Sequence, residues 1–162
     1  MPDMKLWLGQ QTKKKGWTTL DIAGEPDLLR NIHLGLPFPD NTIDEIYAEH
    51  FFEHLNPDEL EFCLKECMRV LKGGGTLKVS VPDFHLACAQ YITGQRSIEE
   101  MQEVIYGDFR KIGGSHKFMF DANNCLDILR KAGFKASLRE PEDIDQDQFK
   151  NHSIYFIGEK QK

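Results

Sequence analysis

The sequence lacks three features that would point to a membrane, to secretion or to a nucleic-acid partner. None of its apolar runs approaches the roughly 18 residues of a membrane span, and residues 1–15 lack the apolar segment of a secretion signal. The net charge is −6 over 162 residues, so no basic excess attracts nucleic acid. These absences predict a soluble, cytoplasmic protein without a membrane partner, and they argue against a nucleic-acid partner without excluding one.

Cysteine is also scarce, and its spacing argues against a common type of site. The four cysteines, Cys63, Cys67, Cys88 and Cys125, include no C-x-x-C pair of the kind found in zinc and redox motifs. We expect reduced thiols, because disulfides belong mainly to secreted proteins. Cys63 and Cys67 share a helical face with leucines, which favours a position in the core.

What the chain does contain is the composition of one globular domain. Its 162 residues fall near the usual size of a single domain, and 40% are hydrophobic while 28% are charged. We find no repeat, low-complexity tract or linker that would divide it. The sequence therefore predicts one domain over residues 1–162.

Short apolar runs alternate with helical patterns along the chain. Strands are expected at 5–9, 17–22, 31–34, 43–48 and 76–82, and then at 135–139 and 153–158. Helices are expected from the Asn56 cap to the glycines at 73–75, over most of 84–114, and from the Asp121 cap to Gly133. This order predicts an α/β fold with a mainly parallel sheet, helices on both faces and an antiparallel C-terminal strand. Only residues 10–16 separate the first two strands, which is too short for a crossover helix.

The stretch "AEHFFEHL" contains His50, Glu53 and His54 in the H-x-x-E-H spacing of some zinc hydrolases. Such a site needs both histidines on one helix and a third ligand from elsewhere. Pro57, at a helix start only three residues after His54, argues against a long helix that carries His50. We therefore expect no metal at this motif, with Glu53 and His54 capping and orienting the next helix, and keep a zinc hydrolase as the least favoured alternative.

Four segments occur in the order typical of one enzyme family. They are "LG…GWTTLDI", "LPFPDNTIDEIYAEHFFEHL", "LKECMRVLKGGGTLKVSVPDF" and "HKFMFDANNCLDILRKAGF", and they span most of residues 5–134. In this order the chain resembles the class I S-adenosylmethionine-dependent methyltransferases, and among them the small methyltransferase-type-11-like group. The resemblance implies a Rossmann-like fold, S-adenosylmethionine as cofactor, and methyl transfer to a small molecule or a glycan hydroxyl.

The resemblance also implies a set of site residues at the carboxyl ends of the strands. Asp21 would accept hydrogen bonds from the cofactor ribose, although it could instead cap the segment that follows. His50 is the candidate general base or acceptor-positioning group, and a hydrogen-bonded histidine at a strand end is the equal alternative. The residues implied to contact the cofactor are Gly9, Gln10, Asp21, Ile22, Leu36, Pro37 and Glu49, with Phe38 completing an apolar wall beside adenine.

Several other positions stay open. Asn31 or Leu34 falls near the expected adenine amino group, and Asp83 and His116 could reach an acceptor or lie in surface loops. The chain reads Gly9-Gln10-Gln11 where the family reads glycine, cysteine, glycine. This departure keeps a second function in view, namely a degenerate, non-catalytic methyltransferase fold that acts as a binding protein.

Overall fold

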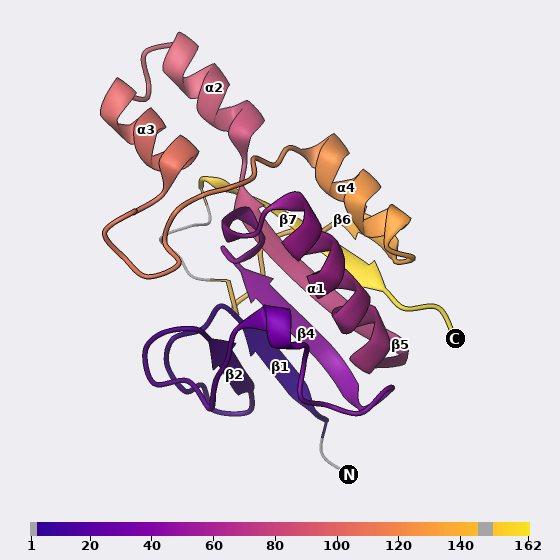
Figure 1. Ribbon diagram of the computed structural model, residues 1–162. Coiled ribbons are helices and arrows are strands. Elements are labelled where there is room, and N and C mark those ends of the chain that lie inside the picture. Colours follow the sequence, from indigo (N-terminus) through magenta and orange to yellow (C-terminus); the bar gives the residue numbers. More distant parts are fainter. Residues whose placement is uncertain (1–2, 146–150) are drawn as a thin grey trace.

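The computed structural model describes residues 3–145 and 151–162. Seven strands form one sheet in the order β3-β2-β1-β4-β5-β7-β6 (Figure 1). The pairs from β3 to β5 are parallel, whereas β7 runs antiparallel to both of its neighbours. The strands are β1 (Lys5–Leu8), β2 (Thr18–Asp21), β3 (Leu28–Leu29), β4 (Ile43–Glu49), β5 (Leu71–Pro82), β6 (Lys135–Leu138) and β7 (Ser153–Glu159).

Polar caps fix where the helices begin. The Asn56 side chain accepts from the Glu59 N–H at 2.9 Å, and the Glu59 carboxylate accepts from the Asn56 N–H at 2.8 Å. Ser97 and Asp121 start two further helices with the same reciprocal arrangement. The helices are α1 (Pro57–Val70), α2 (Phe84–Ile92), α3 (Ile98–Tyr106) and α4 (Ala122–Lys131), with short 3₁₀ turns η1 (Ile32–Leu34) and η2 (Phe52–His54). Within the described ranges, none of these helices combines the length and apolar character that a bilayer span requires.

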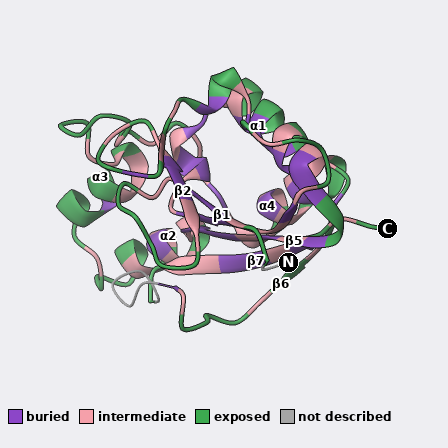
Figure 2. Ribbon diagram, turned by 90° about the horizontal axis from the view of Figure 1, so that it is seen from below, coloured by how far each residue is buried: buried purple, intermediate pink, exposed green. Residues whose placement is uncertain are grey.

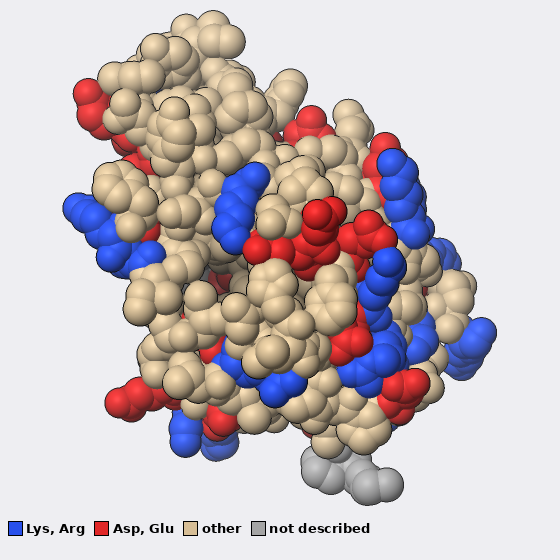
Figure 3. Space-filling view, in the orientation of Figure 1, with Lys and Arg blue, Asp and Glu red and all other residues tan. Residues whose placement is uncertain are grey.

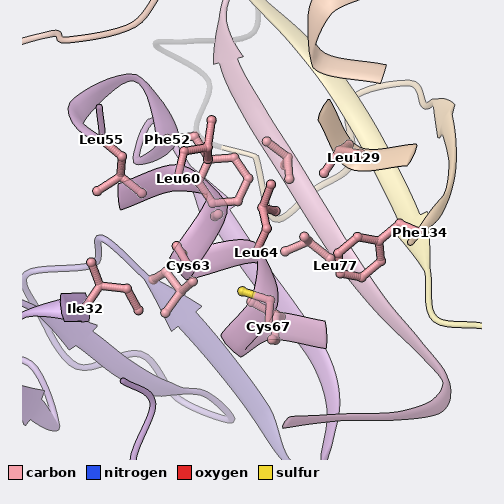
Figure 4. Packing of buried hydrophobic residues seen from close by; sticks show 14 of the residues in the cluster. Ile32, Phe52, Leu55, Leu60, Cys63, Leu64, Cys67, Leu77, Leu129 and Phe134 are labelled. Carbon is pink, nitrogen blue, oxygen red and sulfur yellow. The ribbon is translucent and has the colours of Figure 1, made fainter. Parts of the chain in front are cut away.

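The hydrophobic core lies between the sheet and two helices on the same side of it (Figure 2). Leu60, Cys63, Leu64 and Cys67 of α1 and Leu129 of α4 point into this layer, as Figure 4 shows. They pack against alternate strand residues such as Leu77, because successive side chains in a strand face opposite sides. The expected core position of Cys63 and Cys67 is confirmed, and all four cysteines are free thiols.

The opposite face of the sheet carries aromatic and charged side chains. The rings of Trp7 and Tyr47 meet edge to face with centroids 4.7 Å apart. The chain after β6 folds back over this face, where Arg139 forms an ion pair with Asp145 at 2.7 Å and the Tyr47 hydroxyl donates to Asp145. Meanwhile α2 and α3 pack together beyond the carboxyl ends of the strands (Figure 1). The helix layer therefore covers one face, a distribution that differs from the expected helices on both faces.

The main features predicted from the sequence are confirmed. The sheet is mainly parallel, its C-terminal strand is antiparallel, and residues 9–17 connect β1 to β2 without a helix. This loop runs beside the start of the next connection, where Thr12 and Glu25 form an isolated parallel bridge. A loop thus takes the place of a crossover helix between β1 and β2.

Two predicted elements were wrong. Residues 31–34 form no strand, because the Asn31 side chain accepts from the His33 N–H at 3.0 Å and closes the 3₁₀ turn η1. The third strand is instead the two-residue β3. Likewise, α1 ends at Val70, before the glycines at 73–75, and these glycines belong to β5. A side chain at Gly75 would approach two backbone carbonyls at 3.0 and 3.1 Å, which explains why glycine is needed inside the strand.

Candidate functional site

A cleft of about 830 Å³ opens at the carboxyl ends of β1, β2 and β4. This is the edge at which parallel α/β sheets bind ligands, and the volume lies within the usual range of roughly 300–1,000 Å³ for small-molecule sites. The segment that joins α3 to α4, whose course can be followed in Figure 1, contributes lining residues to one wall. The cleft brings together the following predicted site residues: Gly9, Gln10, Asp21, Ile22, Glu49 and His50.

Gly9 sets the course of the loop that leaves β1. Its φ is +77°, a conformation that favours glycine, and a Cβ atom there would lie 2.8 Å from the Phe51 ring. The next two residues, Gln10 and Gln11, line the cleft, and the Gln11 carbonyl accepts from the Glu25 N–H at 2.8 Å. The glutamine loop is therefore held beside the chain that follows β2, at one end of the cleft.

Asp21 is the last residue of β2 and lies partly buried in the cleft wall. One carboxylate oxygen accepts from the Ala23 N–H at 2.8 Å, so the expected local capping contact is present. Burial raises the pKa of Asp21, and the backbone N–H groups of Ala23 and Ile22 oppose the rise. The capping contact and a position in the cleft coexist, because a carboxylate has two oxygens and several acceptor sites.

His50 follows β4 with a φ of +48°, which is uncommon for a residue other than glycine. Its Nδ1 lies 3.1 Å from Oε1 of Glu53, and its Nε2 lies 2.7 Å from the Ser153 hydroxyl of β7. Its backbone N–H donates to the Ser80 carbonyl at 2.9 Å. His50 is thus both a hydrogen-bonded histidine at a strand end and a residue of the cleft.

Glu53 is the least exposed acidic side chain of the cleft, with 1% of its surface accessible. Burial works against its ionisation, but the bond to His50 and the nearby His54 hold the pKa of Glu53 below its ordinary value. Apart from the ion pair of Oε1 with Nδ1 of His50 at 3.1 Å, the described residues offer neither carboxylate oxygen a hydrogen-bond partner of good geometry. Burying a carboxylate with incomplete hydrogen bonding costs free energy, so a further donor or a cation at this position would stabilise it.

His54 and His116 complete this part of the cleft. Nδ1 of His54 lies 3.0 Å from the Ser115 carbonyl, and Nδ1 of His116 lies 2.7 Å from the Val104 carbonyl. The two rings meet edge to face with centroids 5.0 Å apart. Burial lowers the pKa of His116, which favours its neutral form. The sequence left open whether Asp83 and His116 reach an acceptor, and of these two His116 lies in the cleft.

The apolar wall expected from Leu36, Pro37 and Phe38 needs correction, because none of them lines the cleft. The Leu36 N–H donates to Glu66 at 2.8 Å, and Arg69 donates to the Leu36 carbonyl at 2.9 Å. These contacts hold the segment against α1, and Leu36 joins the core.

The structure also places the other positions that the sequence left open. Asn31 lies in the cleft wall, whereas Leu34 and Asp83 do not. Asp83 instead caps α2, because its side chain accepts from the Leu86 N–H at 3.0 Å.

Sequence reasoning missed the wall that the segment 108–117 provides. This segment adds Lys111, Ile112 and Lys117 to the cleft. It turns back on itself through a bridge between Gly107 and Ser115. The glycines at 107, 113 and 114 are the only signal of such turns, and they do not indicate where the loop packs.

The cleft fits a nucleoside cofactor in its position, its volume and its chemistry. It lies outside the carboxyl ends of parallel strands, a glycine opens the loop after β1, and a carboxylate ends β2. In dinucleotide-binding folds an acidic residue at the end of the second strand binds ribose hydroxyls. Asp21, Gly9 and Ile22 are the residues placed to hold such a group.

Comparisons with known proteins agree with this architecture. Residues 10–79 match the family described as "Methyltransferase domain". A search of curated proteins finds no matching sequence.

Solved structures share the fold at low sequence identity. An S-adenosylmethionine-dependent methyltransferase from Methanosarcina mazei is 19% identical with a TM-score of 0.62, covering 99% of this chain and 94% of that one. One from Archaeoglobus fulgidus is 18% identical with a TM-score of 0.63, covering 98% of this chain and 86% of that one. The YcgJ protein of Bacillus subtilis is 11% identical with a TM-score of 0.62, covering 99% of this chain and 93% of that one.

These likenesses establish the fold, and the family match spans cleft residues that include Gln10, Asp21 and His50. S-adenosylmethionine is the cofactor that the family and the fold imply. Residues 10–79 thus resemble a methyltransferase domain, and the chain as a whole has the fold of S-adenosylmethionine-dependent methyltransferases.

Proposed function

We propose that this protein transfers a methyl group to a hydroxyl of a small molecule or a glycan. The observation that supports the proposal best is the convergence of Gly9, Asp21 and His50 on one cleft of a methyltransferase fold. S-adenosylmethionine, when bound, supplies an electrophilic methyl group on a sulfonium. The task of the chain is then to hold donor and acceptor in line and to accept the proton of the acceptor.

Asp21, Gly9, Gln10, Ile22 and Glu49 would hold the cofactor. Asp21 offers a carboxylate to the ribose hydroxyls, and charge-assisted bonds of this kind are the strong ones. Ile22 supplies an apolar surface at the same end of the cleft. Glu49 lies buried at the end of β4, where its negative charge favours a cationic ligand.

His50 would act as the general base. The Glu53 carboxylate can only accept a hydrogen bond, so it favours the proton on Nδ1 of His50 and leaves Nε2 as the basic nitrogen. Nε2 contacts the Ser153 hydroxyl at 2.7 Å, which is the kind of group an acceptor presents. An acceptor hydroxyl that displaces the Ser153 hydroxyl from Nε2 would give its proton to Nε2 as its oxygen attacks the methyl group.

The charge of the protein favours a small or neutral acceptor over nucleic acid. Basic and acidic side chains alternate on the face shown in Figure 3, without a continuous basic area. The net charge of −6 would repel a polyanion. We propose a cytoplasmic enzyme whose acceptor is a small molecule or a glycan.

Binding of S-adenosylmethionine, measured by calorimetry, tests the cofactor half of this proposal. Asp21→Asn keeps the side-chain size and can still accept from Ala23, but it loses the charge that strengthens bonds to the ribose. A bond to a charged group contributes about 1.5–3 kcal/mol, so affinity should fall at least about tenfold. Asp127→Asn, at an exposed side chain of α4, is the matched control and should bind like the native protein. Equal affinities in all three proteins would remove Asp21 from the site.

A second function, a degenerate fold that binds a partner without catalysis, is favoured by Gln10-Gln11 in the loop after β1. Replacing this pair with Cys-Gly separates the two functions. Comparable and measurable affinity before and after replacement supports the enzyme, because the native loop then leaves room for the cofactor. Binding that emerges only in the variant marks the natural chain as degenerate. Absence of binding in both proteins contradicts the cofactor assignment.

A further inference from the structure

Three potential metal ligands from two distant segments meet in the cleft. Glu53 and His54 belong to η2, and His116 belongs to the segment between α3 and α4. One ligand atom from each of the three lies within 4.8 Å of the other two. We propose that Glu53, His54 and His116 bind a divalent transition ion, with Zn²⁺ the best fit, and that its remaining coordination positions face the cleft.

Both histidines are prepared as ligands by backbone carbonyls. A carbonyl oxygen can only accept, so the contacts of Nδ1 with Ser115 and Val104 place the proton of each ring on Nδ1. The lone pair of each imidazole is then on Nε2. Metal-binding histidines are commonly fixed in this way, with the second nitrogen donating to a carbonyl or a carboxylate.

The buried Glu53 carboxylate supplies a second, independent observation. With 1% exposure and no hydrogen-bond partner of good geometry in the described chain, it holds negative charge that its surroundings do not fully satisfy. Its Oε1 faces Nδ1 of His50 at 3.1 Å, and a cation bound at Oε2 would meet the remaining need. Lys117 does not supply this charge, because its ammonium group pairs with Glu59 at 2.9 Å.

The backbone brings the two segments together before any ion binds. The Lys117 N–H donates to the Glu53 carbonyl at 2.7 Å, and the His116 N–H donates to the Tyr106 carbonyl at 2.9 Å. Tetrahedral zinc with bonds of about 2.0–2.1 Å needs ligand atoms about 3.3 Å apart. The three ligand atoms already lie within 4.8 Å of one another, so side-chain adjustment alone can close the site around an ion, with the backbone already in place.

The donor set decides the class of ion. Calcium and magnesium prefer oxygen ligands, whereas two imidazoles and a carboxylate suit zinc, iron, manganese and cobalt. Three protein ligands also leave an open position, as in catalytic zinc sites.

This site differs from the H-x-x-E-H arrangement, in which His50 would be a ligand. Both ring nitrogens of His50 already contact Glu53 and Ser153, so His50 is not a ligand in the proposed site. For Glu53 and His54 the proposal replaces the expectation from the sequence that the motif holds no metal. His116 takes the place that the motif would give to His50.

The consequence for the acceptor rests on the proposed function. An ion held beside His50 would select acceptors that present an oxygen ligand, and it would lower the pKa of a coordinated hydroxyl. Binding of the ion itself does not depend on methyl transfer, and it can be measured alone.

Cobalt titration of untagged, chelator-treated protein tests the site, because bound Co²⁺ gives visible d–d absorption. We expect one Co²⁺ per chain, displaced by Zn²⁺ and unaffected by excess Mg²⁺, together with a higher thermal midpoint when Zn²⁺ is added. His54→Ala and His116→Ala should each weaken binding by more than the 10- to 100-fold typical of outer-shell changes. His85→Ala on exposed α2 is the matched control and should bind like the native protein.

Each result decides between the site and its alternatives. Loss of one Co²⁺ in both site variants, with unchanged circular dichroism spectra, supports the site. No binding by the native protein, or equal binding by all variants, overturns it. If a site variant fails to fold, the native protein's spectrum and its displacement by Zn²⁺ still decide. S-adenosylmethionine affinity is measured on the same metal-free protein, so failure of the cofactor assignment is distinguished from failure of the metal site.

Discussion

The ion pair of Arg139 and Asp145 carries a strong prediction about the stability of the fold. Asp145→Asn keeps the shape of the side chain and removes its charge. The two side chains are only 7% and 0% exposed, and two bonds of 2.7 Å join them. The substitution therefore leaves the buried guanidinium of Arg139 with only the Glu142 carboxylate, 3.9 Å away, as counter-charge.

The expected loss is about 3–5 kcal/mol in the free energy of unfolding, the usual effect of removing one partner of a buried pair. The amide oxygen of the substituted side chain can still accept from Tyr47 or Arg139, which places the expected value near the lower end. A loss of this size is a large part of the roughly 5–15 kcal/mol available to a domain. The variant should therefore be folded but much less stable.

Urea unfolding followed by tryptophan fluorescence measures the loss, since Trp7 lies against Tyr47 on the same face. Burial works to raise the pKa of Asp145, but the bonds from Arg139 and from the Glu142 N–H hold it below its ordinary value. The charged carboxylate therefore adds stability above the pKa of an unfolded aspartate, and this stability is lost as the pH falls through the lower folded value. The difference between native protein and variant should be full at neutral pH and shrink in acid.

The surface variant Asp127→Asn serves as control and should change stability by less than about 0.5 kcal/mol. A loss below about 1 kcal/mol for Asp145→Asn at neutral pH would refute the reasoning. So would a loss of about 3 kcal/mol that does not depend on pH, because that result would point to shape and not to charge.

Two further substitutions test the loop after β1 and the start of α1. Gly9→Ala should lower the free energy of unfolding by about 1–2 kcal/mol, because the residue has a φ of +77° and its Cβ atom would lie 2.8 Å from Phe51. The loop must then shift, so binding of S-adenosylmethionine should also weaken. Unchanged unfolding and binding would contradict this. Asn56→Ala should lower stability by about 0.5–2 kcal/mol through loss of the capping box with Glu59, measured by thermal unfolding, and should leave cofactor binding intact. A cap variant as stable as the native protein would show that α1 depends on core packing alone.

Local signals in the sequence predicted much of the sheet and its helices. Asn56 and Pro57 mark the start of α1, and the short gap at 10–16 excludes a crossover helix. The polar turn at 31–34 was missed, because Asn31 closes a 3₁₀ turn with its own neighbours in a stretch that also contains apolar residues. Local side-chain bonds of this kind compete with strand formation, and apolar pattern alone does not reveal them.

The sequence predicted the site residues that end strands, because the order of the strands alone decides where those residues lie. Asp21 and His50 end strands, so their place in the cleft follows from the sheet. Leu36 was assigned to the wrong surface, because its bond to Glu66 depends on the packing of α1. The nearness of His116 to Glu53 depends on the path of a long loop. Such contacts between distant segments have no local signature, which is why the third ligand could not be located from spacing.

The lengths of the two outermost strands have a consequence for association between copies of the chain. Unpaired backbone groups along a sheet edge can template the addition of a foreign strand, and long, flat, apolar edges do so most readily. Here the sheet ends at β3, which has two residues, and at β6, which has four and begins with Lys135. Each edge offers little backbone to an incoming strand. The fold is thus protected at both edges against strand-mediated aggregation.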